Sequence, residues 1–100
     1  MATQLIHNHS TPVIDQQGVS YTAHIFGEER PDGTWIGWLE FRPVDDRGYV
    51  LRTGRETSQP NREAVEYWAL GLEPIYLDGA LARSVKVEAR DTTAEARPRR

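Results

Sequence analysis

Apolar and polar residues alternate over residues 19–25, and two further stretches of strand composition, rich in aromatic and branched residues, follow at 35–42 and 49–53. A period of two is typical of a strand that buries one face. The short connections between the stretches are rich in Asp and Gly, which suits tight turns. The sequence therefore predicts a three-stranded antiparallel meander, and weaker alternation adds a possible fourth strand at 12–15.

The period changes to that of a helix after the third stretch. Ser58 or Asn61 can cap a helix start, and Gly71 and Pro74 can end it. One apolar stripe follows the helical spacing i, i+3, i+4 and i+7: Val65, Trp68, Ala69 and Leu72. A second short helix is predicted over residues 75–85, where apolar residues recur four apart.

These elements predict one α+β domain: an antiparallel three- or four-stranded meander, then a helix and a second short helical segment. The domain is expected to span residues 12–85. Residues 1–11 and 86–100 lack apolar periodicity, so we expect a flexible N-terminal arm and a disordered C-terminal tail.

Strand alternation assigns the residues of the meander to two faces. The first face is the expected core, with Gly37 leaving room for a helix residue such as Trp68: Val19, Tyr21, Ala23, Ile25, Trp35, Gly37, Leu39, Phe41, Tyr49 and Leu51. The second face is too apolar for a solvated surface and is the predicted interaction face: His24, Phe26, Ile36, Trp38, Arg42, Val50 and Arg52. Three candidates could cover this face: residues 75–85 folded back over it, a second copy of the chain, or a foreign ligand.

Charge and composition argue against some classes of binding partner. Residues 86–100 carry five basic and three acidic side chains, whereas the other 85 residues carry seven and twelve. A net acidic body argues against general binding to duplex DNA, which depends on clustered Lys and Arg. The chain has no cysteine, no apolar stretch of membrane-spanning length and no recognisable signal peptide, so a cytoplasmic protein without membrane association is expected.

Few residues suggest chemistry. His7 and His9 have a metal-ligand spacing, but they fall in the unpatterned arm, and His24 is tied to no nucleophile by any motif. Acidic residues cluster at the predicted turns, which are exposed to solvent. Paired carboxylates act as acid and base only where burial separates their pKa values, so these clusters are expected to be solvated turn residues. We therefore assign no catalytic, metal-binding or cofactor-binding residue and expect no enzyme.

Three short motifs resemble a known family. Tyr21-Thr22-Ala23 opens the first strand, Asp32-Gly33-Thr34-Trp35 forms the first turn, and Thr53-Gly54-Arg55-Glu56-Thr57 leads into the helix. With the order β-β-β-α, residues 19–72 resemble the partial RNase H-like domain of HicB-type antitoxins. The resemblance implies a protein-binding module rather than an enzyme and identifies no toxin.

The sequence thus predicts a small non-catalytic protein-interaction or regulatory module whose protein partner is unidentified. The more specific prediction is that the partner is a second copy of the chain, which gives a homodimer. The alternative is a single-stranded nucleic-acid-binding protein that uses Phe26, Trp38, Arg42 and Arg52, because aromatic and arginine side chains on a sheet face can stack with bases. The run at 67–81 is the most distinctive part of the sequence, and no function attaches to it.

Overall fold

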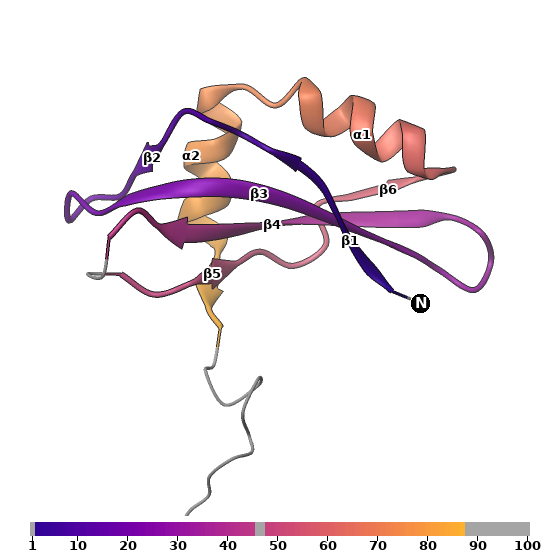
Figure 1. The fold of residues 1–100 in the computed structure, drawn as a ribbon, viewed down its shortest axis with the longest axis horizontal. Helices are drawn as coiled ribbons and strands as arrows, with labels where there is room; N and C mark the ends of the chain where they lie inside the picture. Colours follow the sequence, from indigo (N-terminus) through magenta and orange to yellow (C-terminus); the bar gives the residue numbers. More distant parts are fainter. Residues whose placement is uncertain (1, 46–47, 88–100) are drawn as a thin grey trace, which may run out of the picture.

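The structure is a computed structural model that describes residues 2–45 and 48–87. In these residues the chain forms a seven-stranded antiparallel sheet and two helices (Figure 1). The predicted α+β class and antiparallel sheet are confirmed, but the predicted three or four strands understate the sheet.

A long hairpin forms the centre of the sheet. It pairs β3 (Ser20–Glu29) with β4 (Trp35–Pro43), and the register places Phe26 opposite Trp38. Gly33 has a φ of 90° in the connecting turn, a conformation that favours glycine. The predicted first turn is therefore present where Asp32-Gly33 indicated it.

Two strands pair with the outer side of β3. The short β2 (Val13–Ile14) is the predicted fourth strand, and β1 (Thr3–Asn8) pairs with the other half of β3. The prediction of a flexible arm is wrong for β1. Its pattern is hidden because the strand lies at an edge, buries Ile6 alone and changes register between Leu5 and His7.

Three short strands extend the sheet beyond β4. β5 (Leu51–Arg52) and β6 (Thr57–Gln59) pair with its two halves, and β7 (Val85–Lys86) pairs with β5. The predicted strand at 49–53 is thus shorter, and Tyr49 is 63% exposed rather than in the core. The first residue of the predicted tail lies in β7, and residues 88–100 fall outside the described part of the chain.

The first helix, α1 (Arg62–Leu70), begins and ends at the predicted signals. The side chain of Asn61 accepts a hydrogen bond from the Ala64 N–H at 2.9 Å, and Gly71 is the C-cap. Val65 and Ala69 are fully buried, and Trp68 and Leu72 pack against the core. The predicted apolar stripe is confirmed.

The second helix, α2 (Pro74–Arg83), begins at the proline that was expected only to end the first one. Proline suits this position because its missing N–H would have no partner in the first turn of a helix. Leu77 and Leu81 are buried, as the spacing predicted, but Val85 lies in β7 and is exposed.

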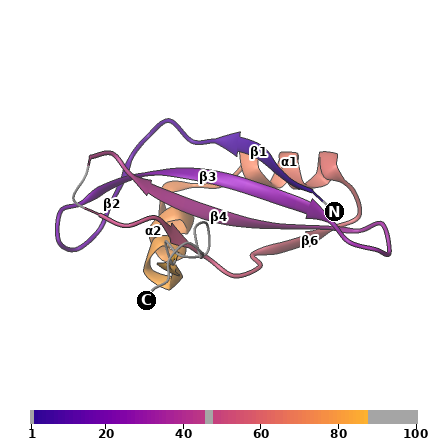
Figure 2. The ribbon, with the colours of Figure 1, turned by 60° about the horizontal axis from the view of Figure 1, so that its bottom comes forward.

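Both helices cover the same face of the sheet. Their buried residues form one core with the first face of β3 and β4 and with Ile6 and Val13. In Figure 2 the strands pass in front of both helices. Gly37 allows the close approach of α1, although Val65 rather than Trp68 fills the space above it. None of the helices in the described residues has the length and apolar character needed to cross a membrane.

Candidate functional site

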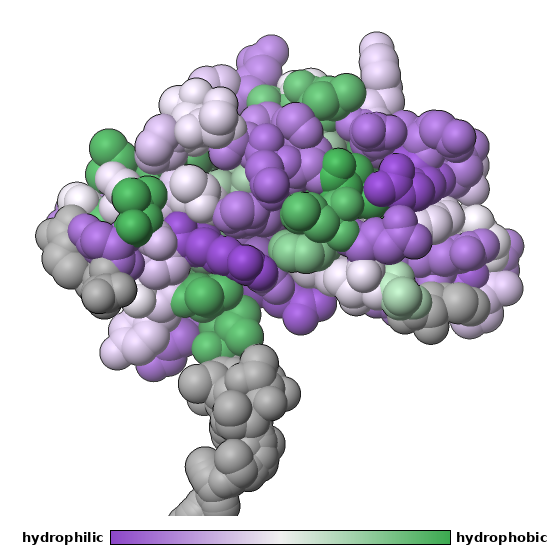
Figure 3. All heavy atoms as spheres, viewed as in Figure 1, coloured by the Kyte–Doolittle hydropathy of each residue, from purple (hydrophilic) through white to green (hydrophobic). Residues whose placement is uncertain are grey.

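The sheet face opposite the helices is the candidate site, and we call it the open sheet face. It carries the predicted interaction residues of the two long strands and Leu5 of β1. The predicted alternative in which residues 75–85 cover this face is wrong, because Leu77, Ala80 and Leu81 of α2 pack into the core on the other side. Figure 3 shows apolar patches on this side of the molecule, among them one over the crossing of β1 with β3 and β4 and one beside β5, with hydrophilic side chains between these two.

Trp38 lies at the middle of this face but is only 4% exposed. The ring of Phe26 lies beside it, with 6.3 Å between the centroids, and the guanidinium of Arg52 lies 4.7 Å above the indole. The indole Nε1 is buried and has no hydrogen-bond partner in the part of the chain that the structure describes. Trp38 is therefore a second, small packing centre rather than an exposed aromatic surface, and Arg52 occupies the ring face that a nucleic-acid base would need.

His24 links the edge strand β1 to β3. With the proton on Nδ1, the ring donates to Asn8 Oδ1 at 2.5 Å and accepts the Thr22 hydroxyl at Nε2 at 2.8 Å. Burial lowers the pKa of His24 below its ordinary 6.5; the nearby Arg42 lowers it further, and Glu40 opposes the shift. Both ring nitrogens are used in structural contacts, so His24 is not arranged as a general base.

The remaining predicted residues of the interaction face make other contacts. Arg42 is exposed and pairs with Glu40 at 3.2 Å. Ile36 is half-buried beside a cavity at the turn end of the sheet. Val50 precedes β5, and its carbonyl accepts the Val87 N–H at 2.9 Å. Of the predicted seven residues, Phe26 and Arg52 both contact Trp38, and Arg42 lies near His24.

Sequence reasoning missed the contribution of β1. Leu5 lies opposite Phe26, which in turn lies opposite Trp38, so an apolar row runs from the edge of the sheet to its centre. Leu5 is 49% exposed. Its strand, Thr-Gln-Leu-Ile-His-Asn, contains neither charge nor proline, the residues that commonly protect an edge strand from pairing.

A second missed feature is a polar clamp behind the sheet, formed by Glu56, Tyr76 and Arg83. The Tyr76 hydroxyl donates to Glu56 Oε1, and Arg83 donates to both carboxylate oxygens, at 2.6 and 3.4 Å. Burial, followed by the Glu56 carboxylate, raises the pKa of Tyr76 to about 12. The clamp joins the Thr53–Thr57 motif to the distinctive run at 67–81, and it gives that run a structural role.

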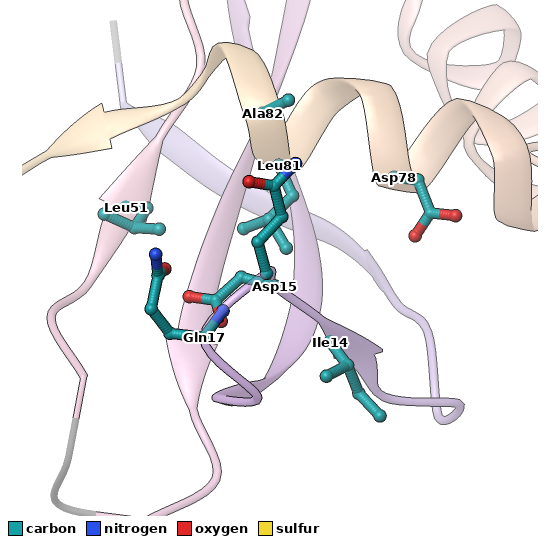
Figure 4. A pocket seen from close by; sticks show the side chains of 8 residues that line it. Ile14, Asp15, Gln17, Leu51, Asp78, Leu81 and Ala82 are labelled. Atoms are coloured by element: carbon teal, nitrogen blue, oxygen red, sulfur yellow. The ribbon is translucent and has the colours of Figure 1, made fainter.

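A cavity of ≈ 630 Å³ lies between α2 and the turn after β2 (Figure 4). Apolar Leu51 and Leu81 line it together with Asp15, Gln17 and Asp78. The Asp15 carboxylate already accepts the backbone N–H groups of Gln17 and Val19 at 2.9 Å. In Figure 4 Asp78 points away from Asp15, so the two carboxylates form no acid–base pair.

The other polar clusters also serve local structure. Asp32 accepts hydrogen bonds from the Thr34 N–H and hydroxyl, which lower its pKa. The rings of His7 and His9 meet edge to face, and His9 contacts the Ala69 carbonyl at 3.0 Å. The described residues contain no group of three or more potential metal-binding side chains among His, Cys, Asp and Glu.

The resemblance to HicB-type antitoxins stays a prediction. The chain matches no protein-family model, no curated protein and no solved structure.

Proposed function

We propose that the protein is a non-catalytic interaction module that self-associates through the edge strand β1. The observation that carries the proposal is the uncharged edge with an exposed apolar residue, Leu5, at the head of an apolar row. β1 is the first strand in the order β1-β3-β4-β5-β7, so its outer backbone groups face away from the sheet. Such an edge is a template for pairing with another strand.

Antiparallel pairing of β1 with the same strand of a second copy fits this edge. A two-fold axis perpendicular to the sheet keeps both copies' helices on one face and both open sheet faces on the other. The Leu5 side chains then lie on the same face as each other, where neighbouring apolar pairs stabilise a sheet. The interface adds backbone hydrogen bonds and apolar contact without burying a charge of β1.

A dimer formed by β1–β1 pairing fits the structure better than a dimer in which the two open sheet faces pack against each other. Face-to-face packing would bury the exposed Arg42 and Arg52, and burying charges costs free energy unless partners meet them. Trp38 is already covered within one chain, so it offers little new apolar area.

Light scattering during size-exclusion chromatography over a wide dilution series tests the proposal. Wild type should be a dimer at high concentration and dissociate on dilution, because the paired edge is small. Leu5→Lys should be a folded monomer throughout, since it places a charge on the pairing edge. Tyr67→Lys is the matched control, because it replaces an exposed apolar residue on α1, and it should stay dimeric. A monomeric wild type at every concentration would rule the dimer out.

Single-stranded nucleic acid is the second candidate partner. The observation in its favour is that Arg42, Arg52 and Arg55 lie on or beside the open sheet face, where, among the described residues, Glu40 pairs with Arg42 alone. Retention of an oligonucleotide that is lost in Arg52→Gln would support this candidate. Equal retention by both proteins would remove it.

A further inference from the structure

A cavity of ≈ 430 Å³ opens at the turn end of the sheet. Arg30, at the start of the turn after β3, and Arg55, before β6, both line it. Ser58 adds a hydroxyl, and Ile36 of β4 adds an apolar wall on the open sheet face. Two arginines and a serine thus line one cavity, and their side chains are donors that suit a tetrahedral anion.

Arg55 differs from the paired arginines of the described chain. Arg42, Arg62 and Arg83 each form an ion pair with a glutamate. The guanidinium of Arg55 has no ion pair or hydrogen bond within residues 2–45 and 48–87. Its five N–H donors are therefore available to a ligand.

The loop that carries Arg55 is held on both sides. Before it, the buried Thr53 hydroxyl accepts the Leu39 N–H at 3.1 Å and donates to the Gly54 carbonyl at 2.8 Å. After it, the Glu56 N–H donates to the Gly37 carbonyl at 2.8 Å, and the clamp holds the Glu56 side chain behind the sheet. Anchored neighbours limit the backbone freedom of Arg55, which lowers the entropy that binding must overcome.

The one carboxylate in the cavity does not cancel the positive charge. Asp32 accepts the Thr34 N–H at 3.0 Å and its hydroxyl at 2.6 Å, and Arg30 interacts with it electrostatically. Two guanidinium groups against one carboxylate leave a net positive charge, which favours an anion.

We infer that this cavity binds a phosphate group, with Arg55 as the main anchor and Arg30 and Ser58 as further donors. The site is separate from the β1 edge, because its lining residues come from the β3–β4 turn, from β4, from the loop before β6 and from β6, and none comes from β1. The phosphate can belong to a small phosphorylated molecule or to a nucleic-acid backbone, and both present the same oxygens to the two arginines.

The test is a titration of the full chain with inorganic phosphate at constant ionic strength, followed by amide chemical shifts. Saturable shifts are expected at Thr34, Ile36 and Ser58. Arg55→Gln should weaken binding by about tenfold, the equivalent of one charge-assisted hydrogen-bonding group. Arg55→Lys should recover part of it, because it restores the charge but not the planar fork. Arg62→Gln, on α1, should bind as wild type does.

Two further titrations identify the source of the phosphate. Tighter binding of a mononucleotide than of inorganic phosphate, with no gain for an oligonucleotide, assigns a small phosphorylated ligand. A gain that appears only with the single-stranded oligonucleotide, and that Arg55→Gln removes, assigns a nucleic-acid backbone. Absence of saturable shifts with all three probes, or equal binding by folded Arg55→Gln, overturns the inference.

Discussion

Glu56 has two roles, one through its backbone and one through its side chain. Its backbone N–H fixes the loop to β4, and its carboxylate binds Tyr76 and Arg83 of α2. The carboxylate is only 11% exposed, whereas Arg83 is half-exposed. The free energy of this contact therefore comes more from satisfying the buried groups than from the solvated charge pair.

Replacement of Glu56 by Ala should lower the free energy of unfolding by about 1–3 kcal/mol, because the Tyr76 hydroxyl loses its acceptor. Chemical denaturation measures the loss. The same variant should also lower the pKa of Tyr76 from about 12, since the Glu56 carboxylate contributes to that value, and absorbance of the phenolate reports it. Glu29→Ala, at an exposed strand end, is the control, and equal stability of the two variants would contradict the clamp.

His24 makes folding sensitive to acid. Burial holds its folded-state pKa below the ordinary 6.5, so the unfolded chain binds more protons in the window between the two values. The free energy of unfolding should therefore be highest above pH 6.5 and fall as the pH drops through that window. His24→Gln should flatten this dependence in denaturation series, although His7, whose pKa burial also lowers, retains part of it. An unchanged slope would show that His24 titrates alike in both states.

At the scale of elements, the close packing of α1 on the sheet depends on a glycine, Gly37, which has no side chain. A Cβ at Gly37 would lie 3.1 Å from Thr57 Cγ2 and 3.2 Å from Val65 Cγ1. β6 and α1 thus converge on one point of β4, and both must shift if that point is filled.

Gly37→Ala should lower the free energy of unfolding by about 1–3 kcal/mol, the usual cost of overpacking a core. Gly54→Ala is the matched control, because a Cβ there meets nothing within 4 Å, and it should be close to neutral. Thermal or chemical denaturation compares the two. Equal effects would mean that α1 adjusts its position freely.

The elements also show what a single sequence can predict. β3 and α1 bury one full side, so their periods of two and of 3.6 identified them, and the aromatic and branched composition of β4 identified that strand; together they gave most of the core. β1, β6 and β7 are short or lie at edges, and their pairing depends on distant strands that leave no local pattern. The clamp was missed for the same reason, because 20 residues separate Tyr76 from Glu56 and 27 separate Arg83 from it.

At the scale of the whole molecule, the helices and the open sheet face present different chemistry. The helices carry exposed carboxylates together with Arg62 and Arg83, and the sheet side carries arginines and Glu40 around a small aromatic centre, with an apolar edge. The proposed self-association at β1 and the proposed phosphate site are compatible, because none of the residues that line the cavity belongs to β1.

The last prediction follows from mass action. If folded chains pair through β1 and unfolded chains do not, association stabilises the folded state, and the thermal midpoint must rise with protein concentration. Calorimetry of wild type across a dilution series should show this rise, whereas Leu5→Lys should melt at one temperature throughout. The difference in the free energy of unfolding between wild type and Leu5→Lys at high concentration should vanish on dilution, because a surface lysine costs little in the monomer. A deficit in Leu5→Lys that persists at every dilution would instead mean that Leu5 stabilises the single chain through Phe26, and the edge would lose its role in pairing.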